Sequence, residues 1–397
     1  MVLFTILAPG AWRMKPKRLK SSLRWINKLK NEKMKKSIVL FALMAMCITA
    51  LSQTKTYLIK GTVNKAINLE LEYNDWGTKS EKIVITDGTF EISGELKEGT
   101  WPRAASISVI EGNSRRGNTV ILEPGVITVA FNTKMATVGG TNENVNYELL
   151  TSQLKKYSEE SASTFYDWQR AYNNKAPQEE LERLWNKNED AKEAERDLTL
   201  KLLRNNNSFA SMVILPRIAR YEGAKAVEPF IKMFQRFSYT NNYENLKKHY
   251  DAMYRCTDGA KIKDFTLPAP DGKMVSLSDF KGKWVLLDFW YVDCHWCRKL
   301  APNLGIIYNE YKDKGLEIIS ISVDKESDRE RMLKVIADDK MVWTQVNDKT
   351  KTTLPEYFGV TGYPTLFLID PQGRGMKMKV GYCEAAGLRR FLNKYIK

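Results

Sequence analysis

Two cysteines separated by two residues are the part of this sequence best suited to chemistry. Cys294 and Cys297 follow an apolar, strand-like run at 284–289 and begin a helical pattern. At such a junction the two sulfurs can reach each other across one helical turn. Unpaired N–H groups at a helix N-terminus favour the thiolate of the first cysteine, and the second is placed to resolve a mixed disulfide. The spacing therefore indicates thiol–disulfide exchange.

The elements that position this pair follow an α/β pattern over residues 259–397. The region opens with a hairpin whose turn is Pro270-Asp271-Gly272. Extended runs then alternate with helical patterns: strands at 284–289, 316–323, 343–346, 365–369 and 376–380, and helices after Cys297 and at 327–337, 353–358 and 384–395. This alternation predicts a mixed sheet with helices packed on it.

Residues 53–135 have the pattern of a β domain. Short runs of period two recur between turn signals such as Asp87-Gly88 and Pro124-Gly125. The runs lie at 57–63, 67–73, 83–85, 89–92, 107–110, 120–122 and 126–131. They predict a small antiparallel β-sandwich. It contains no catalytic constellation of side chains, which favours a packing or docking role. Residues 133–142, rich in Gly, Thr and Asn, are predicted to be a linker.

Residues 136–258 are predicted to be a helical connector, helical from Glu143 onward. Apolar residues recur there at helical spacing among many Glu and Lys residues. Pro177 is expected to begin a second helix, and Ser208 to cap a later one. The charge-rich faces are interpreted as solvated surfaces, with partner binding or dimerisation as the alternative.

The positive charge of the chain is concentrated near its N-terminus. The 397 residues carry a net charge of +15, but residues 1–52 hold eleven Lys and Arg and one acid, a surplus of ten. The rest carries about +5, so charge indicates no nucleic-acid partner. A basic start at Met34, an apolar core at 38–51 and a small-residue site predict a signal peptide at 34–52.

Residues 1–33 are then interpreted as a spurious or extended N-terminus. Retention of the apolar segment as an uncleaved membrane anchor and lipid attachment at Cys47 are alternatives. Export would place the mature chain in an oxidising compartment with four cysteines, which is too few for a disulfide scaffold. With His249 and His295 as the only histidines, a His-based zinc site is nearly excluded. No cofactor is expected.

Further motifs accompany the cysteine pair. They are Phe265-Thr266-Leu267 with Asp271-Gly272, a strand ending at Trp290, Pro302 in the following helix, and the run at 360–370 that contains Pro364. Together with the cysteines, these residues resemble the thioredoxin superfamily, in its TlpA/ResA-like, redoxin (AhpC/TSA) branch, over residues 260–397. The N-terminal β region resembles a domain of unknown function that precedes exported redoxin domains.

The resemblance implies a role for each matching position. Cys294 would be the attacking thiolate, and Cys297 the buried resolving thiol. Pro364 would follow a cis peptide bond and pack against the sulfurs. Asp288 would be a buried acid with a raised pKa that relays a proton to or from Cys297.

The chain also departs from the family pattern. Many relatives have Trp before the first cysteine, whereas this chain has Asp293, whose carboxylate disfavours a thiolate. His295, when protonated, favours the thiolate, and the sequence leaves the balance open. Leu300 occupies the position where ResA-type relatives carry a Glu, so that acid has no counterpart here.

The sequence therefore predicts a multidomain α+β protein with an N-terminal β-sandwich, a helical connector and a C-terminal thioredoxin-like α/β domain. Its expected activity is exchange with disulfides of envelope or periplasmic proteins, in the reductase direction, with a membrane or envelope electron donor. The sequence leaves open whether a small-molecule ligand binds. The alternatives are a non-catalytic interaction protein and a thiol peroxidase. Tyr291 disfavours the peroxidase, because peroxidases have Thr or Ser three positions before the peroxidatic cysteine. Cys256 and Cys383 are expected to pair together, stay as buried single thiols, or carry substrate electrons.

Overall fold

The computed structural model describes residues 6–7, 11–12, 55–64, 69–75, 79–97, 99–111, 114–132, 136–349 and 353–397. Two compact units are present, Met1–Lys55 and Thr56–Lys397. Within the first unit, the structure describes β1 (Ile6–Leu7), β2 (Ala11–Trp12) and Lys55. The predicted signal peptide, the anchor alternative and Cys47 lie outside the described residues. Among the residues described, no helix has both the length and the apolar character needed to cross a membrane.

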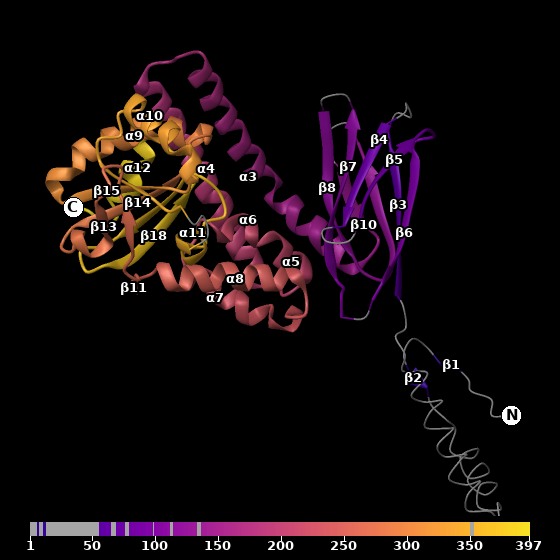
Figure 1. Cartoon of the computed structure of the whole chain (residues 1–397). Helices are drawn as coiled ribbons and strands as arrows, with labels where there is room; N and C mark the ends of the chain where they lie inside the picture. Colours follow the sequence, from indigo (N-terminus) through magenta and orange to yellow (C-terminus); the bar gives the residue numbers. More distant parts are fainter. Residues whose placement is uncertain are drawn as a thin grey trace, which may run out of the picture. The chain divides into compact units, whose positions relative to one another are not determined.

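Two four-stranded sheets form the β region, in the orders β10-β9-β3-β6 and β5-β4-β7-β8 (Figure 1). The strands are β3 (Lys55–Val63), β4 (Leu69–Asp75), β5 (Lys79–Ile85), β6 (Thr89–Leu96), β7 (Arg103–Glu111), β8 (Ser114–Leu122), β9 (Gly125–Phe131) and β10 (Ala136–Gly139). Alternation within β9 buries Ile127, Val129 and Phe131, which form one hydrophobic core with residues of both sheets. The predicted sandwich is therefore present.

Two details of this region differ from the sequence analysis. The sandwich is not wholly antiparallel, because β3 and β9 pair in parallel from Tyr57↔Gly125 to Val63↔Phe131. The predicted linker at 133–142 was wrong in part, because β10 pairs with β9 and buries Ala136 and Val138. The many Gly and Thr residues of this run favoured a linker, so the alternation of the two inward-facing residues, Ala136 and Val138, was not recognised as a strand.

The helical connector contains two long helices followed by shorter ones. They are α3 (Asn142–Asn173), α4 (Gln178–Arg204), α5 (Phe209–Ile214), α6 (Pro216–Ala219), α7 (Ala224–Met233), the 3-10 turn η1 (Gln235–Phe237) and α8 (Asn241–Cys256). Pro177 is the N-cap residue of α4, and Ser208 caps α5 by accepting a hydrogen bond from the Ser211 N–H, as predicted. Helices α3 and α4 pack along each other as an antiparallel hairpin.

The C-terminal region is built on a six-stranded mixed sheet of order β11-β18-β17-β14-β15-β16. Its strands are β11 (Ala260–Lys261), β14 (Trp284–Trp290), β15 (Leu316–Ser322), β16 (Thr344–Asn347), β17 (Thr365–Ile369) and β18 (Arg374–Val380). Strands β12 (Thr266–Pro268) and β13 (Met274–Ser276) form the predicted hairpin. The remaining elements are η2 (Leu277–Phe280), α9 (His295–Tyr311), η3 (Lys312–Lys314), η4 (Glu326–Asp328), α10 (Arg329–Asp338), α11 (Thr353–Phe358) and α12 (Ala385–Leu392).

Strands β14 and β15 are parallel, whereas β17 and β18 run antiparallel to their neighbours. Every residue of β15 is buried, as expected for a central strand covered on both faces. The carboxyl end of β14 therefore delivers the cysteine motif to one end of this sheet, where α9 begins. Together, the β-sandwich, the helical connector and this thioredoxin-like domain give the predicted fold class.

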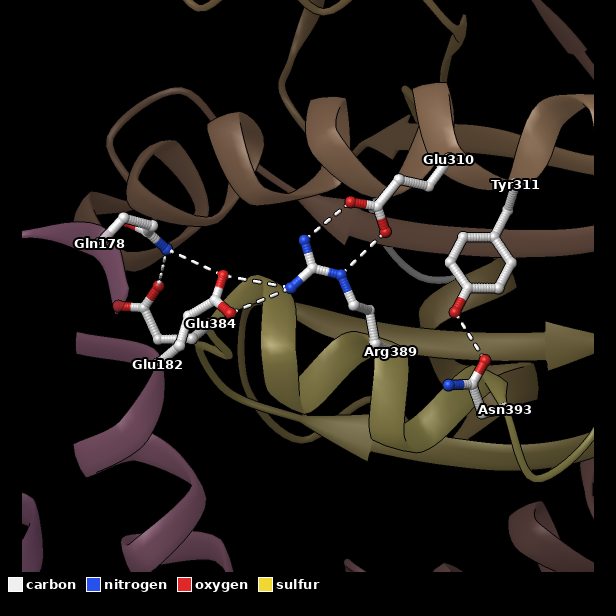
Figure 2. A network of polar contacts seen from close by, with 7 residues as sticks. All are labelled: Gln178, Glu182, Glu310, Tyr311, Glu384, Arg389 and Asn393. Carbon is white, nitrogen blue, oxygen red and sulfur yellow. Dashed lines mark hydrogen bonds and ion pairs between the residues drawn. The ribbon is translucent and has the colours of Figure 1, made fainter. Parts of the chain in front are cut away.

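The charged face of α4 is not simply solvated, which corrects the sequence interpretation. Arg389 of α12 binds Glu182 of α4 at 3.0 Å and Glu310 of α9 at 2.7 Å (Figure 2). Lys379 of β18 binds Glu189 of α4 at 2.9 Å. These contacts could not be predicted from the i,i+4 pattern of charges, because the sequence does not reveal which charged side chains face another element.

Candidate redox active site

The cysteine pair has the geometry that its spacing predicts. Cys294 is the N-cap residue of α9, and its Sγ accepts a 3.1 Å hydrogen bond from the Cys297 N–H. The two sulfurs form a disulfide, with Cα atoms 5.2 Å apart. The first sulfur therefore lies at the positive end of the helix dipole, where a thiolate is stabilised after reduction.

Both cysteines are largely covered in the oxidised protein, with each residue 5 % exposed. The residue between the two cysteines also contacts the connector. Trp296, which lies between the cysteines, has its ring 6.5 Å from that of Trp168 on α3 and 5.6 Å from that of Tyr382. The redox motif is thus part of an aromatic cluster that includes a residue more than one hundred positions earlier in the chain.

The loop before β17 lies against the motif. The Tyr363–Pro364 peptide bond is cis, as the resemblance implied, and Pro364 is buried. The Tyr363 ring contacts that of Tyr291 edge-on at 5.3 Å, three residues before the first cysteine. Two hydrogen bonds fix the loop: the Gly381 N–H donates to the Pro364 carbonyl at 2.8 Å, and the Thr365 hydroxyl donates to the Gly362 carbonyl at 2.6 Å.

Asp288 is 3 % exposed within β14, between Ser320 of β15 and Leu366 of β17. Its Oδ2 accepts a 2.7 Å hydrogen bond from the Ser320 hydroxyl. Burial raises the pKa of Asp288 to about 7, against the opposing effect of that hydrogen bond. No ionised group is among the causes of the shift. Asp288 is therefore a carboxyl that can be neutral or charged near neutral pH.

The direction of the hydrogen bonds at Asp288 follows from donor chemistry. The indole N–H of Trp343 donates to Ser320 Oγ at 2.8 Å, and an indole nitrogen cannot accept. The Ser320 hydroxyl thus accepts from Trp343 and donates its own hydrogen to Asp288, whose Oδ2 is the acceptor. Oδ1 has no hydrogen-bond partner among the described residues, so it is the oxygen free to carry a proton.

Asp293 has a charge partner that the sequence did not indicate. Its carboxylate binds the guanidinium of Arg331 on α10, at a site where both side chains are more than half exposed. This pairing offsets the negative charge next to Cys294. His295 is exposed, and Leu300 is fully buried in the core beneath α9. The effect of neighbouring charges on the Cys294 thiolate therefore depends on Arg331 as well as on Asp293 and His295.

The two remaining described cysteines are separate buried thiols. Cys256 and Cys383 are both unbonded and fully buried. Burial raises the pKa of each thiol to about 12. The two cysteines therefore do not pair with each other, and each is a buried single thiol. No group of three or more His, Cys, Asp or Glu side chains that could hold a metal ion occurs within the described residues.

Sequence reasoning missed the connector's contribution to this site. Trp168 is fully buried, its ring lies 5.0 Å from that of Trp185, and its indole N–H donates to Glu384 Oε1 at 3.1 Å. Glu384 also accepts from the Tyr382 hydroxyl at 2.8 Å and from the Gln178 amide at 3.2 Å. The sequence feature that could have indicated this contribution is the presence of two tryptophans, Trp168 and Trp185, in otherwise polar helices.

The fold and the site together define a thioredoxin-like redox domain. Residues 259–374 match the family model "AhpC/TSA family", and residues 57–147 match "Domain of unknown function (DUF4369)". Thiol-disulfide oxidoreductase ResA from Bacillus subtilis (strain 168) is 30% identical over 142 residues, covering 34% of this chain and 75% of the relative. The corresponding ResA from Bacillus thuringiensis subsp. konkukian (strain 97-27) is 33% identical over 136 residues, covering 34% of this chain and 77% of the relative.

The chain therefore belongs to the family of thioredoxin-like thiol-disulfide oxidoreductases, and it carries an additional N-terminal domain. A solved thioredoxin domain of a thiol-disulfide oxidoreductase from Bacteroides vulgatus is 35% identical, with a TM-score of 0.32, covering 35% of this chain and 97% of that one.

Proposed function

We propose that this protein is an exported thiol–disulfide oxidoreductase that reduces disulfides of other proteins in the periplasm or cell envelope. The observation that supports this most directly is the Cys294–Cys297 disulfide at the start of α9. The cis-Pro364 loop and the buried Asp288 accompany it. The site residues are assigned as follows: Cys294 attacks, Cys297 resolves, Asp288 relays a proton, and Pro364 shapes the substrate side.

The reaction begins from the reduced pair. The Cys294 thiolate attacks one sulfur of a substrate disulfide, forming a mixed disulfide and releasing the other substrate sulfur as a thiolate. Cys297 loses its proton and attacks Cys294, which closes the protein disulfide and releases the second substrate sulfur. Two electrons and two protons pass from the protein dithiol to the substrate.

Asp288 is suited to take the proton from Cys297 during the second attack. A base with a pKa near 7 accepts and returns protons readily at neutral pH. With Oδ2 committed to Ser320, Oδ1 is the atom that would receive the proton. The oxidised pair must then be reduced again by a dithiol donor of the membrane or envelope.

A redox titration tests this function. The protein is equilibrated in defined glutathione buffers, trapped with an alkylating agent and read by mass. Cys294 and Cys297 are expected to change together as one two-electron couple, with a midpoint below about −200 mV for a reductase. A midpoint near −120 mV would indicate an oxidant or isomerase. Wild-type disulfide reduction by a Cys294→Ser protein would remove Cys294 as the nucleophile.

A non-catalytic interaction protein is the second candidate, and the low exposure of Cys294 favours it. In that case the disulfide would be a structural bond within the aromatic cluster. Failure of the pair to change across the whole range of glutathione buffers would establish this alternative. A thiol peroxidase finds no support at Tyr291, which has no aliphatic hydroxyl to offer a peroxide.

A further inference from the structure

A cavity of about 540 Å³ separates the connector from the redox domain. Trp296, from between the two cysteines, and Tyr363, next to Pro364, both line it, so the cavity reaches the redox centre. Its opposite wall includes Trp185 and Tyr221 of the connector. We name this cavity the connector groove. Its volume is within the range of sites that hold small ligands or short peptide segments.

The groove runs along the edge of β18. Residues 377–382 all line it, although successive side chains of a strand point to opposite faces. A cavity that contacts consecutive residues lies beside the strand rather than over one face. On this side β11 pairs with β18 only at Arg374 and Gly375, so no described strand covers the edge from Lys377 onward. An extended segment fits such an edge.

The groove carries an excess of positive charge. Seven lysines and arginines line it, against three glutamates. The ion pairs involving these cations are Lys379–Glu189 at 2.9 Å, Lys192–Glu189 at 3.9 Å, Lys377–Glu222 and Arg196–Glu222 at 3.4 Å each, and Arg390 with Asp190 and Glu193.

Two cations of the groove have no carboxylate partner within the described part of the chain. The Arg217 guanidinium donates a 2.6 Å hydrogen bond to the Tyr147 hydroxyl and pairs with no acid. Lys394, after α12, forms no ion pair with any residue that the structure describes. A partner carrying carboxylates would supply the missing charges, and the aromatic walls would cover apolar side chains between them.

We propose that the connector groove binds an extended, acidic segment of the substrate polypeptide next to the disulfide that is reduced. This inference rests on the proposed function and adds to it the class of substrate. The connector thereby selects substrates by charge, and the cysteine pair performs the exchange. Arg217 and Lys394 provide the unpaired cations, and β18 provides the edge along which the segment lies.

Two synthetic peptides test the inference. Each contains the same intramolecular disulfide, followed by either four glutamates or four glutamines, and its reduction by the full-length reduced protein is followed by alkylation and mass. We expect kcat/KM to be about tenfold higher for the glutamate peptide at low salt, from two ion pairs of about 0.7 kcal/mol each. The preference is expected to fall as salt is added.

The charge-reversal variant Arg217→Glu/Lys394→Glu should bring the ratio of the two kcat/KM values to one or below. Lys187→Glu is the matched control, because Lys187 is exposed on α4 and does not line the groove, and it should keep the ratio of the wild type. Circular dichroism verifies folding. If the reversal variant unfolds, Arg217→Gln/Lys394→Gln replaces it and should reduce the ratio.

Equal rates for the two peptides with the wild type would overturn the inference, as would an equal loss of preference in Lys187→Glu. A preference for glutathione disulfide over an uncharged disulfide, without a preference between the peptides, would assign the groove to a small anion and also overturn it. Reduction of 2-hydroxyethyl disulfide by the wild type distinguishes these results from failure of the proposed function, since that failure would abolish reduction of both peptides, of glutathione disulfide and of 2-hydroxyethyl disulfide.

Discussion

The hydroxyl of Ser320 donates a 2.7 Å hydrogen bond to the carboxyl of Asp288 in the middle of the redox-domain sheet. Trp343 fixes the direction of that bond by donating to the same hydroxyl. The buried carboxyl of Asp288 is thus oriented by Ser320 on the adjacent strand β15, and Ser320 is in turn oriented by Trp343. The proton affinity of Asp288 depends on both of these residues.

Replacement of Ser320 by Ala is expected to raise the pKa of Asp288 by about 1 pH unit, because a hydrogen bond to the charged form is lost. Carbon-13 NMR of the aspartate carboxyls in the oxidised protein measures it. Ser322→Ala is the matched control, since Ser322 is also buried on β15 but donates to Asp324. An unchanged titration of Asp288 in Ser320→Ala would contradict the assigned direction of the bond.

The raised pKa of Asp288 also predicts how stability depends on pH. The native state holds the proton up to about pH 7, whereas the unfolded chain releases it near its ordinary value of 3.8. The stabilising contribution of the neutral carboxyl is therefore complete below pH 4 and is lost as pH rises through 7.

Relative to Asp288→Asn, the free energy of unfolding of the wild type should therefore fall by roughly 4 kcal/mol between pH 4 and pH 8. Denaturant unfolding of the two oxidised proteins at several pH values measures this difference. A constant difference across the range would show that Asp288 titrates normally.

Cys256 and Cys383 are expected to resist alkylation in the folded protein. With a pKa of about 12, each thiol is a thiolate in only about one molecule in ten thousand at pH 8. After mild reduction, iodoacetamide should modify Cys294 first and leave both buried thiols intact until denaturant is added. Peptide mapping by mass identifies the modified positions, and early modification of Cys383 would contradict its burial.

Arg389 is expected to hold the connector to the active-site helix. Its replacement by Leu leaves Glu182 and Glu310 without their shared cation, and should lower the free energy of unfolding by about 1–2 kcal/mol. Hydrogen exchange of α4 should increase at the same time. Arg183→Leu is the control, since among the described residues Arg183 pairs only with Glu180 on the same helix, and its removal should leave the free energy of unfolding close to that of the wild type.

The sequence predicted those parts of the site that depend on local pattern. The N-cap position of Cys294 and the strand that carries Asp288 follow from residues adjacent in the chain, whereas the cis bond before Pro364 was implied by the family resemblance. The contacts of Trp168 and Arg331 could not be predicted in this way, because they depend on which faces of distant helices meet. A helical period shows that a face exists, but does not identify what packs against it.

The same limitation explains the two corrections in the β region. β10 is only four residues long, and its pairing with β9 is determined by the core rather than by strong β propensity. The parallel pairing of β3 with β9 joins segments more than sixty positions apart, which alternation alone cannot reveal.

The buried contact between Trp168 and Glu384 has a practical consequence for anyone who wishes to produce the redox domain alone. The match to the redox family model begins at residue 259. The folded unit begins earlier in the chain, because connector helices pack against the redox domain. A fragment that starts where the family match begins would expose the aromatic side chains of Trp296 and Tyr382 to water and leave the Glu384 carboxylate without two of its donors. Such a fragment is expected to self-associate. The shortest fragment that stays monomeric should therefore retain the helical hairpin of α3 and α4.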